Sequence, residues 1–190
     1  MSSTIETKRL LLLSGKNERD NAAFLRMLKE DGDFEMFSGI EYSEKNLQGF
    51  DGYLEREGFY AIYPKNDPKE LFGYVGIAWN LSSEWYEAEF YIKRDVRRRG
   101  YCKEALHALC QAAYGGAVIS QSPDGNGNPP ELEAVYAVTQ TENHPAKLLL
   151  SKCGFHPTDR NVITAFRLLI NPETEETYWF PIVEYVLERQ

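Results

Sequence analysis

Hydrophobic and polar residues alternate with a period of two in some segments of the chain and recur at helical spacing in others. The first pattern predicts strands and the second predicts helices. Strands are expected over Arg9 to Leu13, Phe59 to Tyr63, Leu71 to Asn80, Glu84 to Lys93, Leu132 to Thr139, Val162 to Ile170 and Tyr178 to Leu187. Helices are expected over Asn17 to Leu28, Gly100 to Tyr114 and Pro145 to Cys153. This interleaving predicts a mixed α/β fold, with helices on both faces of one sheet.

Two segments follow neither period. Residues 31–58 mix aromatic residues with glycines and acids, which predicts short helices and loops. Residues 115–130 are rich in Pro, Gly and Asn, and predict a mobile surface loop. This loop is either a lid or partner contact or a tolerated insertion, and we favour the insertion because loop length costs little free energy.

The composition is that of one well-packed soluble domain spanning residues 1–190. The chain is 43% hydrophobic and 26% charged, which is enough apolar material for a sizeable core. Its formal net charge of -8 argues against nucleic acid as the main partner, because phosphate-binding surfaces need a basic footprint. A cationic amine is the more compatible guest.

Cysteine usage and the N-terminal segment indicate the compartment. Cys102, Cys110 and Cys153 are odd in number and show no paired spacing, so we expect neither disulfides nor a zinc site. The three histidines share no motif, and no metal is expected. The first residues show no signal-peptide pattern, and no apolar run approaches the ~20 residues of a membrane helix. We therefore expect a cytoplasmic protein without membrane attachment.

The run Arg97-Arg98-Arg99-Gly100-Tyr101-Cys102 joins an expected strand to an expected helix. Backbone N–H groups in a glycine turn and in the first turn of a helix lack intrahelical partners, and the helix dipole adds positive charge there. Phosphate is the natural ligand of such a turn. Taken alone, however, three arginines fit a solvated loop or a nucleic-acid patch as well as they fit a phosphate site.

This run is one of several that occur in an order resembling the GNAT superfamily of N-acetyltransferases. The resembling segments are Glu89-Phe90-Tyr91-Ile92, Arg97-x-x-Gly100-x-Cys102, Glu104-Ala105-Leu106, Glu142-Asn143 and Lys152-Cys153-Gly154-Phe155. Within the superfamily the chain most resembles the branch of the ribosomal-protein N-terminal acetyltransferases, whose opening strand is similar to Glu6 to Leu12. The resemblance implies a GNAT fold with a mostly antiparallel sheet of about seven strands. It also implies an acetyl-CoA-dependent N-acetyltransferase.

The resemblance also implies where the cofactor binds. Backbone amides of the glycine turn would hold the pyrophosphate of acetyl-CoA, and the end of the preceding strand would pair with the pantetheine arm. Asn143 would hydrogen-bond the same arm, cap its helix, or do both. The implied cofactor-binding residues are Tyr91, Ile92, Lys93, Arg97, Arg98, Arg99, Gly100, Tyr101, Cys102, Lys103 and Asn143.

Glu89 matches the acidic strand position that faces the acceptor amine in many members of the superfamily. It is the expected general base, acting directly or through a water. The alternative is a glutamate that points to solvent or pairs with an arginine. Glu87 is a second candidate, because residues two apart on a strand share a face. The acceptor, a protein N-terminus or a small amine, would attack the thioester directly in a ternary complex, and strand donors near Tyr91 and Ile92 would stabilise the oxyanion.

Two positions depart from the superfamily pattern. Leu150 stands where many relatives carry a tyrosine as general acid, and Ala146 stands where many have a serine. Water or Tyr136 would then protonate the thiolate, although Tyr136 is more simply a packed strand residue. These departures keep open a non-catalytic acyl-CoA-binding regulatory module. The Cys102 thiol would have a lowered pKa at a helix N-terminus, or be a simple substitution. A monomer or homodimer is expected.

Overall fold

The computed structural model describes residues 3–15, 18–31, 50–81, 83–118, 131–159, 166–170 and 177–189. The α-helices and strands in these ranges are β1 (Thr4–Glu6), β2 (Leu10–Leu13), α1 (Glu18–Glu30), β3 (Phe59–Pro64), β4 (Gly73–Asn80), β5 (Trp85–Ile92), α4 (Tyr101–Tyr114), β6 (Ala134–Gln140), α5 (His144–Lys152), β7 (His156–Pro157), β8 (Phe166–Ile170) and β9 (Thr177–Glu188). Two short 3-10 helices, η1 (Tyr53–Glu55) and η2 (Arg94–Val96), complete the described elements.

The strands form one sheet in the order β1-β2-β3-β4-β5-β6-β9-β7, and β8 pairs with β9 off this path. Only β5 and β6 run parallel among these pairs, and all the others are antiparallel. The expectation of a mixed, mostly antiparallel sheet is confirmed. The described residues contain nine strands where about seven were expected, because β1 and β7 are too short to leave a periodic pattern in the sequence.

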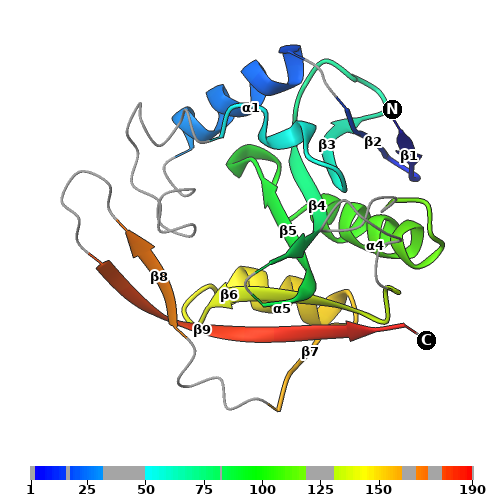
Figure 1. Ribbon diagram of the computed structural model, residues 1–190. Helices are drawn as coiled ribbons and strands as arrows, with labels where there is room; N and C mark the ends of the chain where they lie inside the picture. Colours follow the sequence, from blue (N-terminus) through cyan, green and yellow to red (C-terminus); the bar gives the residue numbers. More distant parts are fainter. Residues whose placement is uncertain are drawn as a thin grey trace.

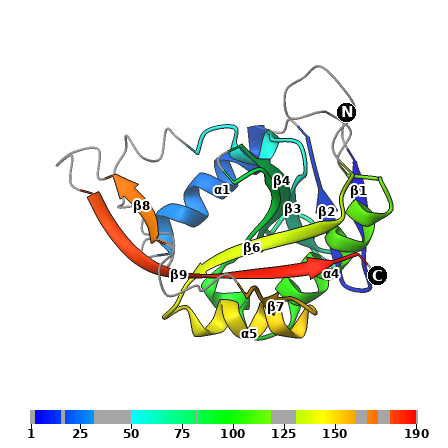
Figure 2. The same cartoon turned by 60° about the horizontal axis from the view of Figure 1, so that its bottom comes forward.

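Helices α4 and α5 cover one face of the sheet. The α4 residues Leu106 and Leu109 are fully buried, and they belong to the same hydrophobic cluster as Val75 and Ile77 of β4. Leu150 places α5 in this cluster as well. Figure 2 shows α5 lying beneath β6 and β9, on the opposite side from α1. The cluster fixes the axis of α4, and therefore the place where its N-terminus meets the end of β5.

Helix α1 covers the other face, across the strands β2 to β5 (Figure 1). Phe24, Met27 and Leu28 are buried at the three- and four-residue spacing of an amphipathic helix. They pack against Phe59 and Tyr74 of the sheet. Helices thus lie on both faces, as the sequence predicted.

The expected elements match the observed ones to within a few residues, apart from three differences. Strands β1 and β7 and the two 3-10 helices carry too few residues for a periodic signal. Of the segment 31–58, residues 50–58 are described and contain η1, whereas 32–49 lie outside the described residues. The expected loop over 115–130 is described only to Val118, and the part of the expected strand Val162 to Ile170 that precedes Phe166 lies outside the described part of the chain.

Candidate active site

Strands β5 and β6 stop pairing after Glu87, close to the other acidic candidate, Glu89. Their register pairs are Tyr86 with Val135 and Glu87 with Tyr136, although β5 continues to Ile92 and β6 to Gln140. On its other side β6 pairs with β9 at seven positions, from Ala134 to Gln140. The last part of β5 is therefore paired with β4 but not with β6, and we call the region where these two parallel strands separate the opening.

The main chain of β5 presents alternate residues to this opening. The Lys93 N–H donates to the Phe72 carbonyl at 2.8 Å, so it faces β4. Because successive backbone groups of a strand point to opposite sides, Tyr91 also faces β4, whereas Phe90 and Ile92 face β6. The Ile92 carbonyl accepts a hydrogen bond from the Nε of Arg97 at 2.7 Å. The backbone of Ile92 is thus directed into the opening.

The chain after β5 folds into a tight turn that leads directly into α4. Arg98 and Gly100 both have left-handed backbone conformations, with φ of 62° and 79°. Gly100 is the N-cap residue of α4 and has no side chain with which to cap the helix. The first N–H groups of α4, at Tyr101, Cys102 and Lys103, consequently point out of the helix toward the turn. Such a turn binds anions by its backbone.

A buried carboxylate ties this turn to α1. Asp31, just past the end of α1, is 6% exposed and accepts hydrogen bonds from the Arg94 N–H at 2.9 Å and from the Arg97 guanidinium at 3.1 Å. Arg97 also donates to the Tyr91 hydroxyl at 2.9 Å. The Arg97 side chain therefore binds protein groups on three sides, and its role in the turn is to shape the backbone.

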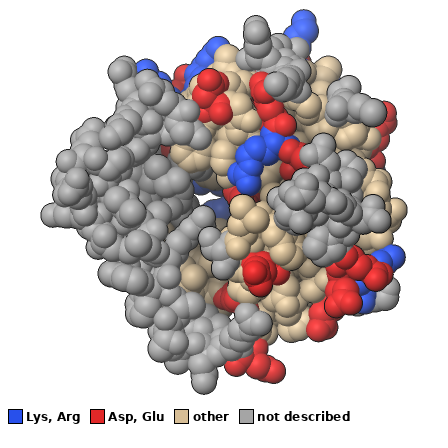
Figure 3. Space-filling model, in the orientation of Figure 1, with Lys and Arg blue, Asp and Glu red and all other residues tan. Residues whose placement is uncertain are grey.

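Other basic side chains near the turn also have protein partners. Lys93 forms an ion pair with Glu70 at 2.7 Å, and Arg99 donates to the Asp95 carbonyl at 3.3 Å. Figure 3 shows that the Lys and Arg side chains on this face of the described residues are interspersed with acidic ones. The arginine-rich run is thus a turn with a specific backbone shape and not part of a broad basic surface.

Asn143 caps α5. Its side-chain oxygen accepts a hydrogen bond from the Ala146 N–H at 3.1 Å, which is the N-cap geometry that the sequence offered as one alternative. Ala146 and Leu150 are both buried, and Leu150 has no exposed surface. Tyr136 stacks on Trp85, with ring centroids 4.6 Å apart, as expected for a packed strand residue.

The three cysteines are free thiols. Cys102 and Cys110 belong to α4, and Cys153 is the residue that ends α5. Burial, with a smaller contribution from Cys153, raises the pKa of Cys102 far above its ordinary value despite the adjacent helix N-terminus. The alternative of a Cys102 thiol with a lowered pKa is therefore wrong, because the loss of hydration outweighs the charge of Arg97. Cys102 is a small packing residue at this position.

Glu89 lies two residues beyond the last β5–β6 register pair, on the face of the sheet that α1 covers. Tyr53 donates a short hydrogen bond from its hydroxyl to Oε2 of Glu89. The guanidinium of Arg56 lies 3.8 Å from Oε1 and over the rings of Tyr53 and Phe59. The Glu89 side chain retains 29% of its exposure, so the carboxylate is oriented by its neighbours and still reachable.

Tyr53 stands in a hydrogen-bonded chain that leads into the core. The buried Tyr74 hydroxyl is hydrogen-bonded to that of Tyr53, which in turn donates to Glu89. Burial, followed by the charge of Glu89, raises the pKa of Tyr53 well above its ordinary value, so Tyr53 stays protonated and remains a donor. By contrast, Glu87 accepts a hydrogen bond from the Asn80 amide at 2.6 Å. The two glutamates share a face but differ in their partners.

Sequence reasoning identified the turn and the strand but missed the residues that hold them. Tyr53, Arg56, Asp31 and Arg9 contact the candidate residues from segments far away in the chain. None of them belongs to a motif with a fixed spacing to the turn. Only the placement of Arg9 in the opening strand pattern gave a local signal, and that signal indicated a strand.

No group of three or more His, Cys, Asp or Glu side chains is placed to hold a metal ion in the part of the chain that the structure describes. Among the same residues, no helix is long and apolar enough to cross a membrane.

Comparisons with known proteins agree with this geometry. An acetyltransferase (GNAT) domain family model matches residues 9–156, whereas no curated protein matches the sequence. A GNAT-family acetyltransferase from Bacillus anthracis superposes with a TM-score of 0.70 at 16% identity, covering 98% of each chain. RimL, a ribosomal-protein alpha-N-acetyltransferase solved with coenzyme A, gives 0.65 at 9% identity over 98% of each chain. The microcin self-immunity acetyltransferase MccE, solved with acetyl-CoA and AMP, gives 0.61 at 12% identity over 96% of this chain and 94% of its own.

The family match spans well over half of the chain and includes the diverging strands, the glycine turn and both helices that flank the opening. The solved neighbours share the whole fold, which confirms the fold expected from the sequence. The chain belongs to the GNAT acetyltransferase family, and it is an acetyl-CoA-dependent acyltransferase.

Proposed function

We propose that this protein transfers the acetyl group of acetyl-CoA to a primary amine by direct attack in a ternary complex, with Glu89 as the general base. The observation that carries the proposal is the position of Glu89 at the point where β5 and β6 diverge, with the N-terminus of α4 beyond the end of β5. A carboxylate is thereby adjacent to the region where the two parallel strands separate.

The residues around the opening fit the cofactor of the family. The left-handed Gly100, which carries no side chain, and the first N–H groups of α4 fit the anion site that we propose. We propose that the turn from Arg97 to Lys103 holds the diphosphate, and that the backbone of Ile92, flanked by Tyr91 and Lys93, pairs with the pantetheine arm. Acetyl-CoA supplies the activated acetyl group as a thioester.

The proposed donor to the developing negative charge is the N–H of Ile92. By strand alternation this donor faces β6, whereas those of Tyr91 and Lys93 face β4. A backbone donor of this kind is fixed before the reaction begins, so no reorganisation is needed when charge develops on the acetyl oxygen. Asn143 caps α5 through its oxygen, which leaves its amide nitrogen to bind the pantetheine arm.

Glu89 is placed to take a proton from the acceptor. Tyr53 fixes one carboxylate oxygen and Arg56 approaches the other, so the carboxylate has a defined orientation at the opening. An amine that enters from the α1 face would meet the side chain of Glu89 before it reached the backbone of β5. Holding the amine and the base together converts a bimolecular encounter into a step within the complex.

The acceptor is proposed as a primary amine, either a protein N-terminus or a small molecule. Both classes occur among the structural neighbours, since RimL is a ribosomal-protein alpha-N-acetyltransferase and MccE is a microcin self-immunity acetyltransferase. The net charge of -8 favours an acceptor that carries positive charge.

The first test isolates the cofactor site by calorimetric titration with acetyl-CoA. The Gly100→Glu variant should lose binding, because it places a side chain and a negative charge in a left-handed turn that faces the diphosphate. Gly116→Glu is the matched control. Gly116 lies beyond the C-terminal end of α4 with φ of 75°, and a Cβ there would have nothing within 4 Å. Equal losses in both variants would contradict the assignment of the turn.

The second test isolates the base. Release of free CoA is followed with a thiol reagent, using N-terminal peptides, an amino acid and a polyamine as acceptors. Glu89→Gln should lower kcat by roughly 100-fold or more, while the Kd for acetyl-CoA stays within about twofold of the wild-type value. Glu87→Gln, on the same strand face, should retain most of the activity. An unchanged kcat in Glu89→Gln would remove Glu89 from the mechanism without affecting the cofactor site.

A further inference from the structure

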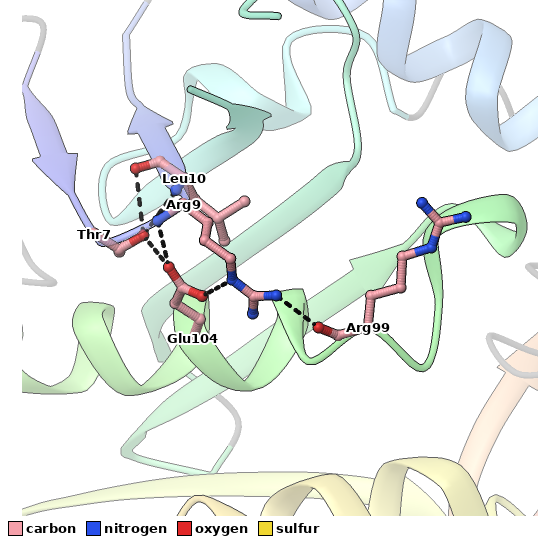
Figure 4. A network of polar contacts seen from close by, with 5 residues as sticks. All are labelled: Thr7, Arg9, Leu10, Arg99 and Glu104. Carbon is pink, nitrogen blue, oxygen red and sulfur yellow. Dashed lines mark hydrogen bonds and ion pairs between the residues drawn. The ribbon is translucent and has the colours of Figure 1, made fainter. Parts of the chain in front are cut away.

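The side chain of Arg9 reaches from the start of β2 to the N-terminus of α4 (Figure 4). Its Nε donates to Oε2 of Glu104 at 2.6 Å, and its Nη1 donates to the Arg99 carbonyl at 2.9 Å. The guanidinium also lies 4.5 Å from the ring centroid of Tyr101. One side chain thus contacts the residue before Gly100, the residue after it, and the first turn of α4.

Glu104 is held by the opening hairpin through both of its carboxylate oxygens. Oε1 accepts hydrogen bonds from the Thr7 hydroxyl at 2.6 Å and from the Arg9 N–H at 2.8 Å, while Oε2 accepts from the Arg9 side chain. Burial alone would raise the pKa of Glu104, but these hydrogen bonds outweigh it and hold the pKa below its ordinary value. The carboxylate is therefore an ionised group directed toward β1 and β2.

This contact matters because of where Glu104 and Arg99 lie. A carboxylate in the first turn of a helix is attracted to the positive end of the helix dipole and to the unpaired N–H groups there, where it would compete with an anionic ligand. Arg99 lies between two residues in left-handed conformations, Arg98 and Gly100, so its carbonyl sets the direction of the turn. Conformations of this kind persist only when their surroundings hold them in place.

We propose that Arg9 is a positioning residue for the diphosphate site. It fixes the Arg99 carbonyl, and it holds the carboxylate of Glu104 away from the N–H groups at the start of α4. The clasp formed by Thr7, Arg9 and Glu104 keeps the anion site in its binding shape before any ligand arrives. This inference rests on the proposed assignment of the turn as the diphosphate site, and it adds a residue outside the motif that defines that turn.

The test compares Arg9→Met with Lys65→Met. Both variants remove a partly exposed cation that forms an ion pair. Arg9 pairs with Glu104 of α4, and Lys65 pairs with Glu6 of β1 at 3.1 Å. Only Arg9 contacts the turn. Arg9→Met should raise the Kd for acetyl-CoA about tenfold and the KM for acetyl-CoA to a similar extent, with kcat at saturation unchanged. Lys65→Met should leave all three within about twofold.

A second measurement records the shape of the turn without any ligand. Hydrogen exchange of the free protein should become faster at the backbone amides of residues 99–104 in Arg9→Met and stay unchanged in Lys65→Met. Arg9→Lys serves where Arg9→Met fails to fold, because a lysine keeps the cation but cannot bind Glu104 and the Arg99 carbonyl together. It should raise the Kd by several-fold.

The outcomes separate this inference from the proposed function. Wild-type protein that binds acetyl-CoA, together with an Arg9→Met variant of unchanged Kd and unchanged exchange, would overturn the role of Arg9 alone. Equal weakening by Lys65→Met would also overturn it, because the effect would then belong to the hairpin in general. Failure of the wild type to bind acetyl-CoA would overturn the diphosphate site and the role of Arg9 with it.

Discussion

The two faces of the sheet are both apolar, but they are built from different side chains. The face under α4 and α5 is dominated around α4 by small and aliphatic residues, such as Ala105, Leu106 and Leu109. The face under α1 contains five aromatic rings in mutual contact, contributed by Phe24, Phe50, Tyr53, Phe59 and Tyr74. The first face holds the helix whose N-terminus forms the proposed anion site, and the second holds the candidate base.

The difference lies in what each core offers to a reaction. The α4 face also contains the buried tyrosines Tyr60, Tyr86 and Tyr185, but the buried residues that α4 itself contributes are small or aliphatic. They fix the position of the helix, which is what a site made of backbone N–H groups requires. On the α1 face, tyrosine hydroxyls bind carboxylates. Tyr63 donates to Asp20 at 2.5 Å, and Tyr53 donates to Glu89. We infer that the sheet separates cofactor positioning from proton handling, with one task on each face.

The largest expected effect comes from breaking the aliphatic face. Leu106→Ala removes a fully buried side chain of α4 and should lower the free energy of unfolding by about 3 kcal/mol. Urea unfolding measures this change. If the α4 face only fixes position, kcat with acetyl-CoA at saturation should be retained at temperatures where the variant is folded. A large loss of kcat in fully folded protein would contradict the separation of tasks.

The next effect tests a hydroxyl of the α1 face that is remote from Glu89. Tyr63→Phe removes the donor to Asp20, whose side chain is buried at 6% exposure. Losing a hydrogen bond to a buried carboxylate should cost about 2 kcal/mol of unfolding free energy. Thermal unfolding provides the readout, with Tyr60→Phe on the opposite face as the control. A Tyr63→Phe variant as stable as the wild type would show that the hydroxyl is dispensable.

Tyr53→Phe sharpens the comparison within the α1 face. It removes the hydroxyl that orients Glu89 and keeps the ring that packs on Phe24 and Phe59. We expect kcat to fall about tenfold, which corresponds to about 1.4 kcal/mol, with little change in the Kd for acetyl-CoA. Tyr74→Phe, one step further along the same chain of hydroxyls, should lower kcat less. The reverse order would contradict the assignment of Tyr53 as the donor that orients Glu89.

The smallest effect concerns the thiols, all of which belong to the α4 face. Burial, with a smaller contribution from Cys153, raises the pKa of Cys110 to about 12 in the folded protein, from an ordinary value of 9.0. The folded state therefore keeps the proton that the unfolded state loses, so this contribution to stability is complete below about pH 9 and declines as the pH rises toward 12. Urea unfolding from pH 8 to 10.5 should show a steeper decline for the wild type than for Cys110→Ala. Parallel curves would contradict a buried protonated thiol.

Much of the fold followed from local patterns, because its main strands and helices are long enough to show their period. The turn at Gly100 was predictable for the same reason, since a glycine between a strand and a helix is a local signal. The partners of the site were not predictable. Tyr53 reaches Glu89 across 36 positions of the chain, and Arg9 reaches Arg99 across 90. A periodic pattern in the sequence carries no information about contacts between residues so far apart in the chain. Cys102 shows a related difficulty. Its position at a helix N-terminus predicts a lowered thiol pKa, whereas burial by residues distant in the sequence raises that pKa.

The placement of β6 has a consequence for the order in which this protein matures. Its seven register partners on β9 lie between Ile182 and Glu188, whereas it shares only two pairs with β5. During synthesis, β6 therefore leaves the ribosome about forty residues before the strand that holds it in place, as the spacing of their ranges requires. We expect nascent chains to acquire the β1–β5 meander early and to become competent for ligand binding only late. Until then, the edge of β6 that pairs with β9 has no partner strand.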